Sequence, residues 1–455
     1  MSTSTHSSEL AAQPAAPKER IFTKKVWAWG LWDWASAAFN AVVTTFVFSV
    51  YITNKDLFGE SANSWLGWVL GGAGVIVAIV APVLGQSVDR SGRRATVLTI
   101  TTLATGVITA LLFFVSPGEG RLWLGLFLLA AGNIAFETGS VVYNALISDI
   151  SKPSNVGRIS GFGWGLGYIG GIVLLLILFV GFINPDVGWF GVTSENGLNV
   201  RVAMLFAAAC TFIFSPPLLL SLRNKPRREG TEKLSIVGAY KELFSSIKRI
   251  WRTDRSIVWF LMSSAIYRDG LAGVFTFGAV LASNAFDFSS SEVIYFGVAA
   301  NLVAGIATIT FGYLDDRLGA RAVIIFSVTA MVVCGFGVFL FHDGVFGMTG
   351  KTVYWVLGLT LCVFVGPTQS ASRTYLARIA PKGEEGEIFG LYATTGRAVS
   401  FLAPFMYSTA ITIGAKATGM SLADAAYFGI LGIIVVLLVG LIAFIPVKAQ
   451  AKFRD

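Results

Sequence analysis

The chain has 455 residues, of which 55% are hydrophobic and only 13% are charged. A soluble protein needs a larger polar surface, so this composition excludes a soluble enzyme and indicates many membrane-spanning helices. The net charge of +8 would suggest nucleic-acid binding in a soluble protein, but in a membrane protein basic residues first mark the cytoplasmic loops. We therefore expect a lipid bilayer around most of the chain and no nucleic-acid partner.

The first 25 residues are rich in Ser, Thr, Ala and Pro and lack the apolar stretch of a signal peptide. We expect them to form a disordered cytoplasmic tail. All three cysteines lie in apolar runs, so neither a disulfide framework nor a cysteine-rich metal site is expected.

Twelve apolar runs follow, each long enough to cross about 30 Å of hydrocarbon as a helix of roughly 20 residues. They cover residues 26–52, 64–86, 95–115, 122–148, 159–182, 200–222, 256–283, 291–312, 321–341, 352–378, 387–412 and 425–446. The predicted fold class is an all-α membrane protein with twelve transmembrane helices.

The Lys and Arg residues are distributed unevenly between the two sides of the membrane. Of the 34, 26 fall on the side of the N-terminus, five on the opposite side and three within the spans. By the positive-inside rule both termini are cytoplasmic, and we expect a multi-pass protein of the plasma membrane.

The longest basic connection, residues 223–255, follows the sixth span and separates bundles at 26–222 and 256–446, with a cytoplasmic tail at 447–455. Apolar residues recur at helical spacing within it: Leu234, Ile236, Val237, Tyr240, Leu243, Phe244, Ile247, Ile250 and Trp251. This pattern predicts an amphipathic helix, which either lies on the anionic inner leaflet or packs on the ends of other helices.

Two segments repeat along the chain. GQSVDRSGRR after the second span matches GYLDDRLGAR after the eighth, at an offset of 227, and GRISG matches GEIFG at an offset of 229. The residues of the longer match are Gly85, Asp89, Arg90, Gly92 and Arg94 in the first copy and Gly312, Asp316, Arg317, Gly319 and Arg321 in the second. The chain therefore consists of two pseudo-symmetric six-helix halves, and parallel repeats of this kind place a substrate between them near the bilayer midplane.

The repeated motif combines glycines for a tight turn, an Asp that can pair with an Arg, and bases for the headgroups. It resembles the signature between helices two and three of the major facilitator superfamily, which implies that fold and a cytoplasmic latch favouring the outward-facing state. A plain basic turn would explain one copy but not two copies in register.

Longer stretches resemble one branch of that superfamily. LWDWASAAFNAVVTTFVF, AIYRDG and GPTQSASRTYLARIAPKGEEGEIFGLYATTGR are similar to the unknown major facilitators, which include the fungal vacuolar amino-acid effluxers linked to autophagy. Trp32, Ser36 and Ile388 depart from the usual Tyr, Asn and Phe of the branch. The resemblance implies amino-acid transport and assigns Arg373 to a family motif.

Ionisable residues inside spans are costly and mark candidate sites. They are Asp33, Glu137, Arg268, Asp269, Arg373 and Arg397, and their charges sum to zero. Such a set suits a zwitterion, with Arg397 binding the carboxylate and Asp269 the amino group, and Glu137 or Asp269 carrying a coupling proton; alternatively the six only neutralise one another. Asn40 and Tyr168 are further candidate contacts.

We expect a secondary transporter of a small polar solute working by alternating access, with or without coupled protons, and a monomer. Transport of sugars or other polar metabolites, and a transport-dead receptor or scaffold, are the alternatives. No Walker A sequence occurs, and the GxGxxG at 165–170 lies in an apolar run with no preceding strand, where it favours helix packing. We predict no cofactor, no metal and no enzymatic activity.

Overall fold

The computed structural model describes residues 20–226 and 236–448. The predicted disordered tails therefore lie mostly outside the described residues, as does Leu234 of the predicted linker helix. Within the described part, the first helix begins at Lys24.

Twelve helices of the described residues are long and apolar enough to cross a membrane, which confirms the predicted spans. The N-terminal half contains α1 (Lys24–Ala37), η1 (Ala38–Phe46), α2 (Phe48–Ile52), α3 (Lys55–Phe58), α4 (Ala62–Ser91), α5 (Arg94–Leu111), η2 (Leu112–Phe114), α6 (Glu119–Ala145), α7 (Ile147–Ile150), α8 (Val156–Leu178), η3 (Phe179–Ile183), η4 (Trp189–Gly191), η5 (Glu195–Gly197), α9 (Leu198–Phe214) and α10 (Pro216–Ser221). The linker forms α11 (Ile236–Thr253).

The C-terminal half contains α12 (Arg255–Phe286), α13 (Ser290–Leu318), α14 (Ala320–Leu340), α15 (Gly350–Val353), η6 (Tyr354–Gly358), α16 (Leu359–Ile379), α17 (Glu385–Ala398), α18 (Leu402–Thr418), η7 (Asp424–Phe428) and α19 (Gly429–Phe444). A hairpin of β1 (Gly344–Val345) and β2 (Met348–Thr349), which the sequence pattern did not predict, joins α14 to α15.

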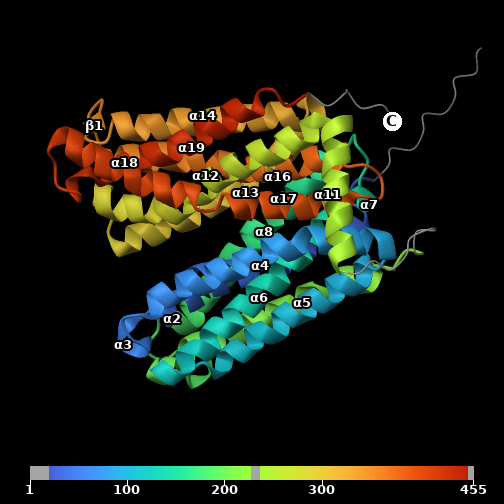
Figure 1. Cartoon of the computed structure of the whole chain (residues 1–455). Helices are drawn as coiled ribbons and strands as arrows, with labels where there is room; N and C mark the ends of the chain where they lie inside the picture. Colours follow the sequence, from blue (N-terminus) through green and yellow to red (C-terminus); the bar gives the residue numbers. More distant parts are fainter. Residues whose placement is uncertain (1–19, 227–235, 449–455) are drawn as a thin grey trace, which may run out of the picture.

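The two halves form two bundles that meet at one end and diverge toward the other (Figure 1). Helix α11 crosses the end where they meet, which we call the α11 end; α3 and the hairpin lie at the opposite end. Closest packing between the halves pairs α4 with α17 and α8 with α13.

The repeated motif ends one helix and begins the next in each half. Gly92 (φ 69°) follows α4 and Gly319 (φ 88°) follows α13, and both adopt the left-handed backbone that glycine tolerates. Asp89 and Asp316 lie in the last turns of these helices, because α4 and α13 continue past their apolar runs by several residues. These last turns stay helical because their charged side chains have partners, described below.

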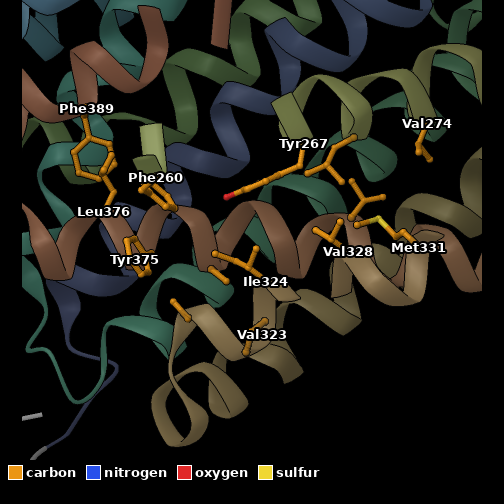
Figure 2. Packing of buried hydrophobic residues seen from close by; sticks show 14 of the residues in the cluster. Phe260, Tyr267, Val274, Val323, Ile324, Val328, Met331, Tyr375, Leu376 and Phe389 are labelled. Carbon is orange, nitrogen blue, oxygen red and sulfur yellow. The ribbon is translucent and has the colours of Figure 1, made fainter. Parts of the chain in front are cut away.

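Aromatic and branched side chains fill the interior of each bundle. In the C-terminal half, Phe260 stacks on Tyr375 with ring centroids 4.4 Å apart, and Tyr267 lies beside them (Figure 2). The Tyr267 hydroxyl shares a 2.7 Å hydrogen bond with Ser372 Oγ, so this buried phenol is satisfied within the bundle.

Several of the spans contain an irregular segment. The first contains the π-helix η1 and the tenth the π-helix η6, while the eleventh is broken between Ala398 and Leu402. Irregular backbone at membrane depth is tolerated where it is buried in protein or lines a polar cavity, and π-segments are frequent at functional sites.

Candidate functional site

The halves touch through two latches of similar backbone, which we call the α4–α17 latch and the α8–α13 latch. In the first, a Cβ on Gly85 would collide with the Gly386 carbonyl; in the second, a Cβ on Gly312 would lie 2.7 Å from the Gly157 carbonyl. All four glycines are therefore required for the close approach of the helices.

The α4–α17 latch is held by charges at the α11 end. Asp89 Oδ2 accepts a hydrogen bond of 3.0 Å from the backbone N–H of Glu387, at the start of α17. Arg94 donates to Asp89 at 2.5 Å, to Glu385 at 2.7 Å and to Asp149 at 3.2 Å. The motif Asp thus pairs with an Arg of its own half, and the same Arg crosses to the other half.

The α8–α13 latch has the same backbone contact with different charges. Asp316 accepts from the backbone N–H of Gly157 at 2.7 Å and from Arg158 Nε at 2.6 Å, both at the start of α8. Arg378 pairs with Asp315 and lies 3.2 Å from Asp316.

Two motif residues predicted to act in the second latch do not do so. Arg321 turns away and donates to the carbonyls of Val447 at 2.7 Å and Ile445 at 2.8 Å, at the end of α19. Arg317 is exposed and has no ion pair among residues 20–226 and 236–448. The prediction that Arg317 and Arg321 belong to a latch is therefore wrong for this conformation.

Helix α11 packs on the ends of other helices, which was one of its two predicted placements. Glu242 pairs with Arg90 of α4, and Arg249 pairs with Glu384 beside α17 at 2.8 Å. The helix thus lies across the α4–α17 latch and contacts both halves. Its other side leaves Phe244 exposed.

Arg373 of α16 reaches from the C-terminal half into the N-terminal half. Its side chain is 1% exposed and donates to Ser160 Oγ at 2.9 Å, to the Ser160 carbonyl at 2.7 Å, to Asn144 Oδ1 at 3.2 Å and to Asp33 Oδ2 at 3.4 Å. Two tryptophan rings lie against its guanidinium, with centroids within 5 Å. Arg373 therefore joins the halves, and Asp33 takes part in this contact in place of the open substrate contact predicted for it.

Glu137 of α6 and Arg397 of α17 form a second ion pair between the halves. Arg397 lies 12 residues from the start of α17, about 18 Å from the α11 end at 1.5 Å per residue. The side chains are 26% and 31% exposed, so this pair is less buried than Arg373 and Asp33, whose side chains are 2% and 15% exposed.

Arg268 and Asp269 do not pair with each other or with the other buried charges. The Arg268 guanidinium lies over the Tyr392 ring, 3.7 Å from its centroid, and donates to the Tyr392 carbonyl at 3.0 Å. Asp269 is 6% exposed and accepts from the backbone N–H of Ala403 at 2.5 Å, at the start of α18. Asp269 caps the second part of the broken eleventh span, so the predicted contact of Asp269 with an amino group is replaced.

Tyr168 and Asn40 lie near the level of the Glu137–Arg397 pair. Tyr168 is the counterpart of Arg397 at the offset of 229, and its hydroxyl donates to Gln369 Oε1 of the other half at 3.2 Å. Asn40 is exposed on η1. Its neighbour Phe39 stacks on Phe136, the neighbour of Glu137, with centroids 5.3 Å apart.

The contact between α4 and α17 ends near this level. From the α11 end upward, α4 follows α17 as far as Gly74, where a Cβ would be 3.8 Å from Arg397 Cδ. Beyond it, Gly67, Gly71 and Gly72 face open space. The Glu137–Arg397 pair therefore lies at the level where the contact between α4 and α17 ends.

The sequence pattern missed several latch residues. The match of GRISG to GEIFG places Arg158 and Glu387 at equivalent positions of the repeat. This equivalence was the one sequence signal that could have identified them as latch residues. No sequence signal identified Asp315 and Arg378 as latch residues, because a charged residue next to a predicted loop is ordinarily solvated.

Comparison with known proteins was informative for most of the chain. Residues 61–452 match the family described as "Vacuole effluxer Atg22 like". The chain is 27% identical over 430 residues to YxiO of Bacillus subtilis, an uncharacterized MFS-type transporter, covering 93% of this chain and 95% of that protein. It is 23% identical over 265 residues to autophagy-related protein 22-1 of Neosartorya fischeri, covering 54% of this chain and 42% of that protein, less than half the fungal protein's length.

Solved structures agree on the fold. The proton:xylose symporter XylE superposes with a TM-score of 0.70 at 13% identity, over 94% of this chain and 96% of that one. A bacterial homologue of the iron transporter ferroportin, in an outward-facing state, gives 0.64 at 15% identity, over 94% and 99%. At these identities the likeness concerns the fold alone.

Proposed function

Because this chain belongs to the Atg22-like family of major facilitator transporters, we propose that it moves amino acids across the membrane by alternating access. The superfamily accounts for transport of a solute between two six-helix halves. The choice of amino acids is our proposal, and it rests on the Glu137–Arg397 pair.

The pair supports a zwitterionic substrate for three reasons. Its two charges come from opposite halves, it lies where the contact between α4 and α17 ends, and both side chains are partly exposed. The planar Arg397 guanidinium suits a carboxylate, and Glu137 suits an ammonium group. An entering amino acid would exchange one internal ion pair for two pairs with the ligand, so neither buried charge is left alone.

We also propose an orientation. The basic residues of the sequence gather at the α11 end, so this end is cytoplasmic by the positive-inside rule and the conformation described is outward-facing. Inward opening then requires both latches to separate while the halves rock around the Glu137–Arg397 level.

The test is transport into proteoliposomes with a panel of labelled amino acids and sugars, with and without a pH gradient. We expect amino-acid uptake that amino acids inhibit at least tenfold better than the matching amines or carboxylic acids, because each analogue lacks one partner of the pair. In Arg397→Gln the KM for the amino acid should rise at least tenfold, whereas Arg121→Gln, an exposed base at the opposite end, should behave as the unmodified protein. Full uptake with unchanged affinity in Arg397→Gln, or movement of sugars alone, would refute the proposal.

A further inference from the structure

Glu387 is a buried acid of the α4–α17 latch that has no part in the proposed substrate site. Its side chain and that of Gln86 meet between the halves, each residue being 4% exposed. Gln86 Nε2 donates to Glu387 Oε2 at 3.3 Å. The remaining oxygens, Glu387 Oε1 and Gln86 Oε1, are buried and have no hydrogen-bond partner among residues 20–226 and 236–448. Two acceptors without a donor are therefore enclosed at one contact, which is unfavourable as long as both remain acceptors.

The bases around Glu387 are committed to other acids. The charged groups around it are Asp89 and Arg90 on α4, Arg94 on α5, Glu242 and Arg249 on α11, and Glu384 and Glu385 at the start of α17. Arg94 pairs with Asp89 and Glu385, Arg249 with Glu384, and Arg90 with Glu242. Ser246 of α11 faces the Glu387 carboxyl, but its hydroxyl forms no hydrogen bond with Glu387 Oε1 and carries no charge. No base forms an ion pair with Glu387 in the described part of the chain.

The α8–α13 latch has a base at the position equivalent to Glu387, so its buried acid has an ion-pair partner. At the repeat offset of 229, Glu387 corresponds to Arg158 of α8. Arg158 Nε donates to Asp316 Oδ2 at 2.6 Å, so the α8–α13 latch has a base where the α4–α17 latch has an acid. An ionised Glu387 would add a negative charge to a dry interface with no matching base.

We propose that Glu387 is a proton-binding site and that the α4–α17 latch closes on its protonated form. The proton on the carboxyl gives Glu387 one donor, and Gln86 Oε1 is the adjacent acceptor that lacks one. The acid and the amide then each donate once and accept once, so both unpartnered oxygens are satisfied. When α4 and α17 separate, Glu387 meets water at the α11 end, ionises and releases the proton there. Closure of this latch thus takes up one proton, and opening returns it to the same side.

This inference rests on the proposed function only for alternating access and not for the substrate, so it is tested without transport. Spin labels on Arg93→Cys and Lys382→Cys, two exposed positions on either side of the latch, report its opening in full-length protein whose three native cysteines are replaced by alanine. The ratio of short to long distances is measured from about pH 5 to about pH 9.

The closed form should decline as the pH rises, with the ratio changing by up to about tenfold per pH unit, the limit for one proton. Glu387→Gln should stay closed and insensitive to pH, since its amide supplies a permanent donor. Glu384→Gln, on the same turn but paired with Arg249 at 2.8 Å, should keep the pH response. Gln86→Leu removes the acceptor and should weaken closure at low pH.

Infrared spectroscopy provides a second readout if the labelled variants do not fold. The carbonyl band of a protonated carboxyl should be present at low pH in the otherwise unmodified protein and absent in Glu387→Gln. A latch ratio that does not vary with pH, a pH response retained in Glu387→Gln, or a ratio that follows sodium at fixed pH would overturn the proposal. Failure of amino-acid transport would leave these outcomes unaffected, so the two proposals fail separately.

Discussion

The two latches start from the same backbone contact, in which a glycine of one half touches a glycine of the other and an Asp accepts from the first N–H groups of the facing helix. Their bases come from different places. In the α4–α17 latch Arg94 of the motif joins the halves, whereas in the α8–α13 latch its counterpart Arg321 leaves the interface and Arg158 binds the Asp instead. The two latches thus share the backbone contact of the repeat but differ in their charges, so we expect them to respond differently to mutation and to pH.

The largest expected effect concerns the fold of the second half. Arg378→Leu leaves Asp315, whose side chain is 2% exposed, as a buried charge without its base. We expect the free energy of unfolding to fall by about 3–5 kcal/mol, the usual cost of breaking a buried pair from one side. Thermal unfolding in detergent measures the loss.

The control for this change is Arg317→Leu, an exposed base at the end of α13 two residues after Asp315, which should stay within about 0.5 kcal/mol of the unmodified protein. The double variant Arg378→Leu/Asp315→Leu should recover most of the stability. A loss below about 1 kcal/mol in the single variant would show that Asp315 finds another partner and that the latches differ less than proposed.

The second prediction separates the two equivalent arginines. Arg94→Leu removes the base that joins Asp89 to Glu385 across the halves, so the latch should open. Hydrogen bonds to charged groups contribute about 1.5–3 kcal/mol each. Their loss should lower the ratio of closed to open protein, measured by the spin-label distances, by about 10- to 150-fold.

Arg321→Leu, its counterpart in the repeat, should leave that ratio unchanged because Arg321 caps α19. If Arg94→Leu and Arg321→Leu open the molecule equally, the inference that the two latches differ in function is wrong.

The smallest effect is expected from α11. Glu242→Gln removes the partly exposed ion pair with Arg90, and such pairs contribute about 0.2–1 kcal/mol. The closed-to-open ratio should fall by a few-fold at most, and Lys248→Gln, an exposed base on the same helix, should have no effect. A tenfold change in Glu242→Gln would make α11 a main component of the latch.

Local sequence was sufficient to predict the membrane spans and the turns between them. Span positions follow from runs of about 20 apolar residues, and the turns at Gly92 and Gly319 follow from a motif that appears twice in register. The span pattern did not predict the break after Ala398, although Pro404 is a local signal for it, because proline has no N–H to donate to the Ser400 carbonyl four residues earlier. Asp269, 134 residues earlier in the chain, supplies the acceptor that lets α18 begin again at Leu402.

The candidate site also combines features that the sequence identifies with features that only the tertiary structure decides. The sequence by itself determined which charges are in the membrane, since an ionisable residue in an apolar run is visible without any structure. Only the tertiary structure decided which of them pair: Arg373 with Asp33, 340 positions apart, and Arg397 with Glu137, 260 positions apart, while Arg268 rests on an aromatic ring. The physical reason is that each pair joins helices of opposite halves, so its geometry is set by how the two bundles pack at the glycine contacts and not by any local preference of the chain.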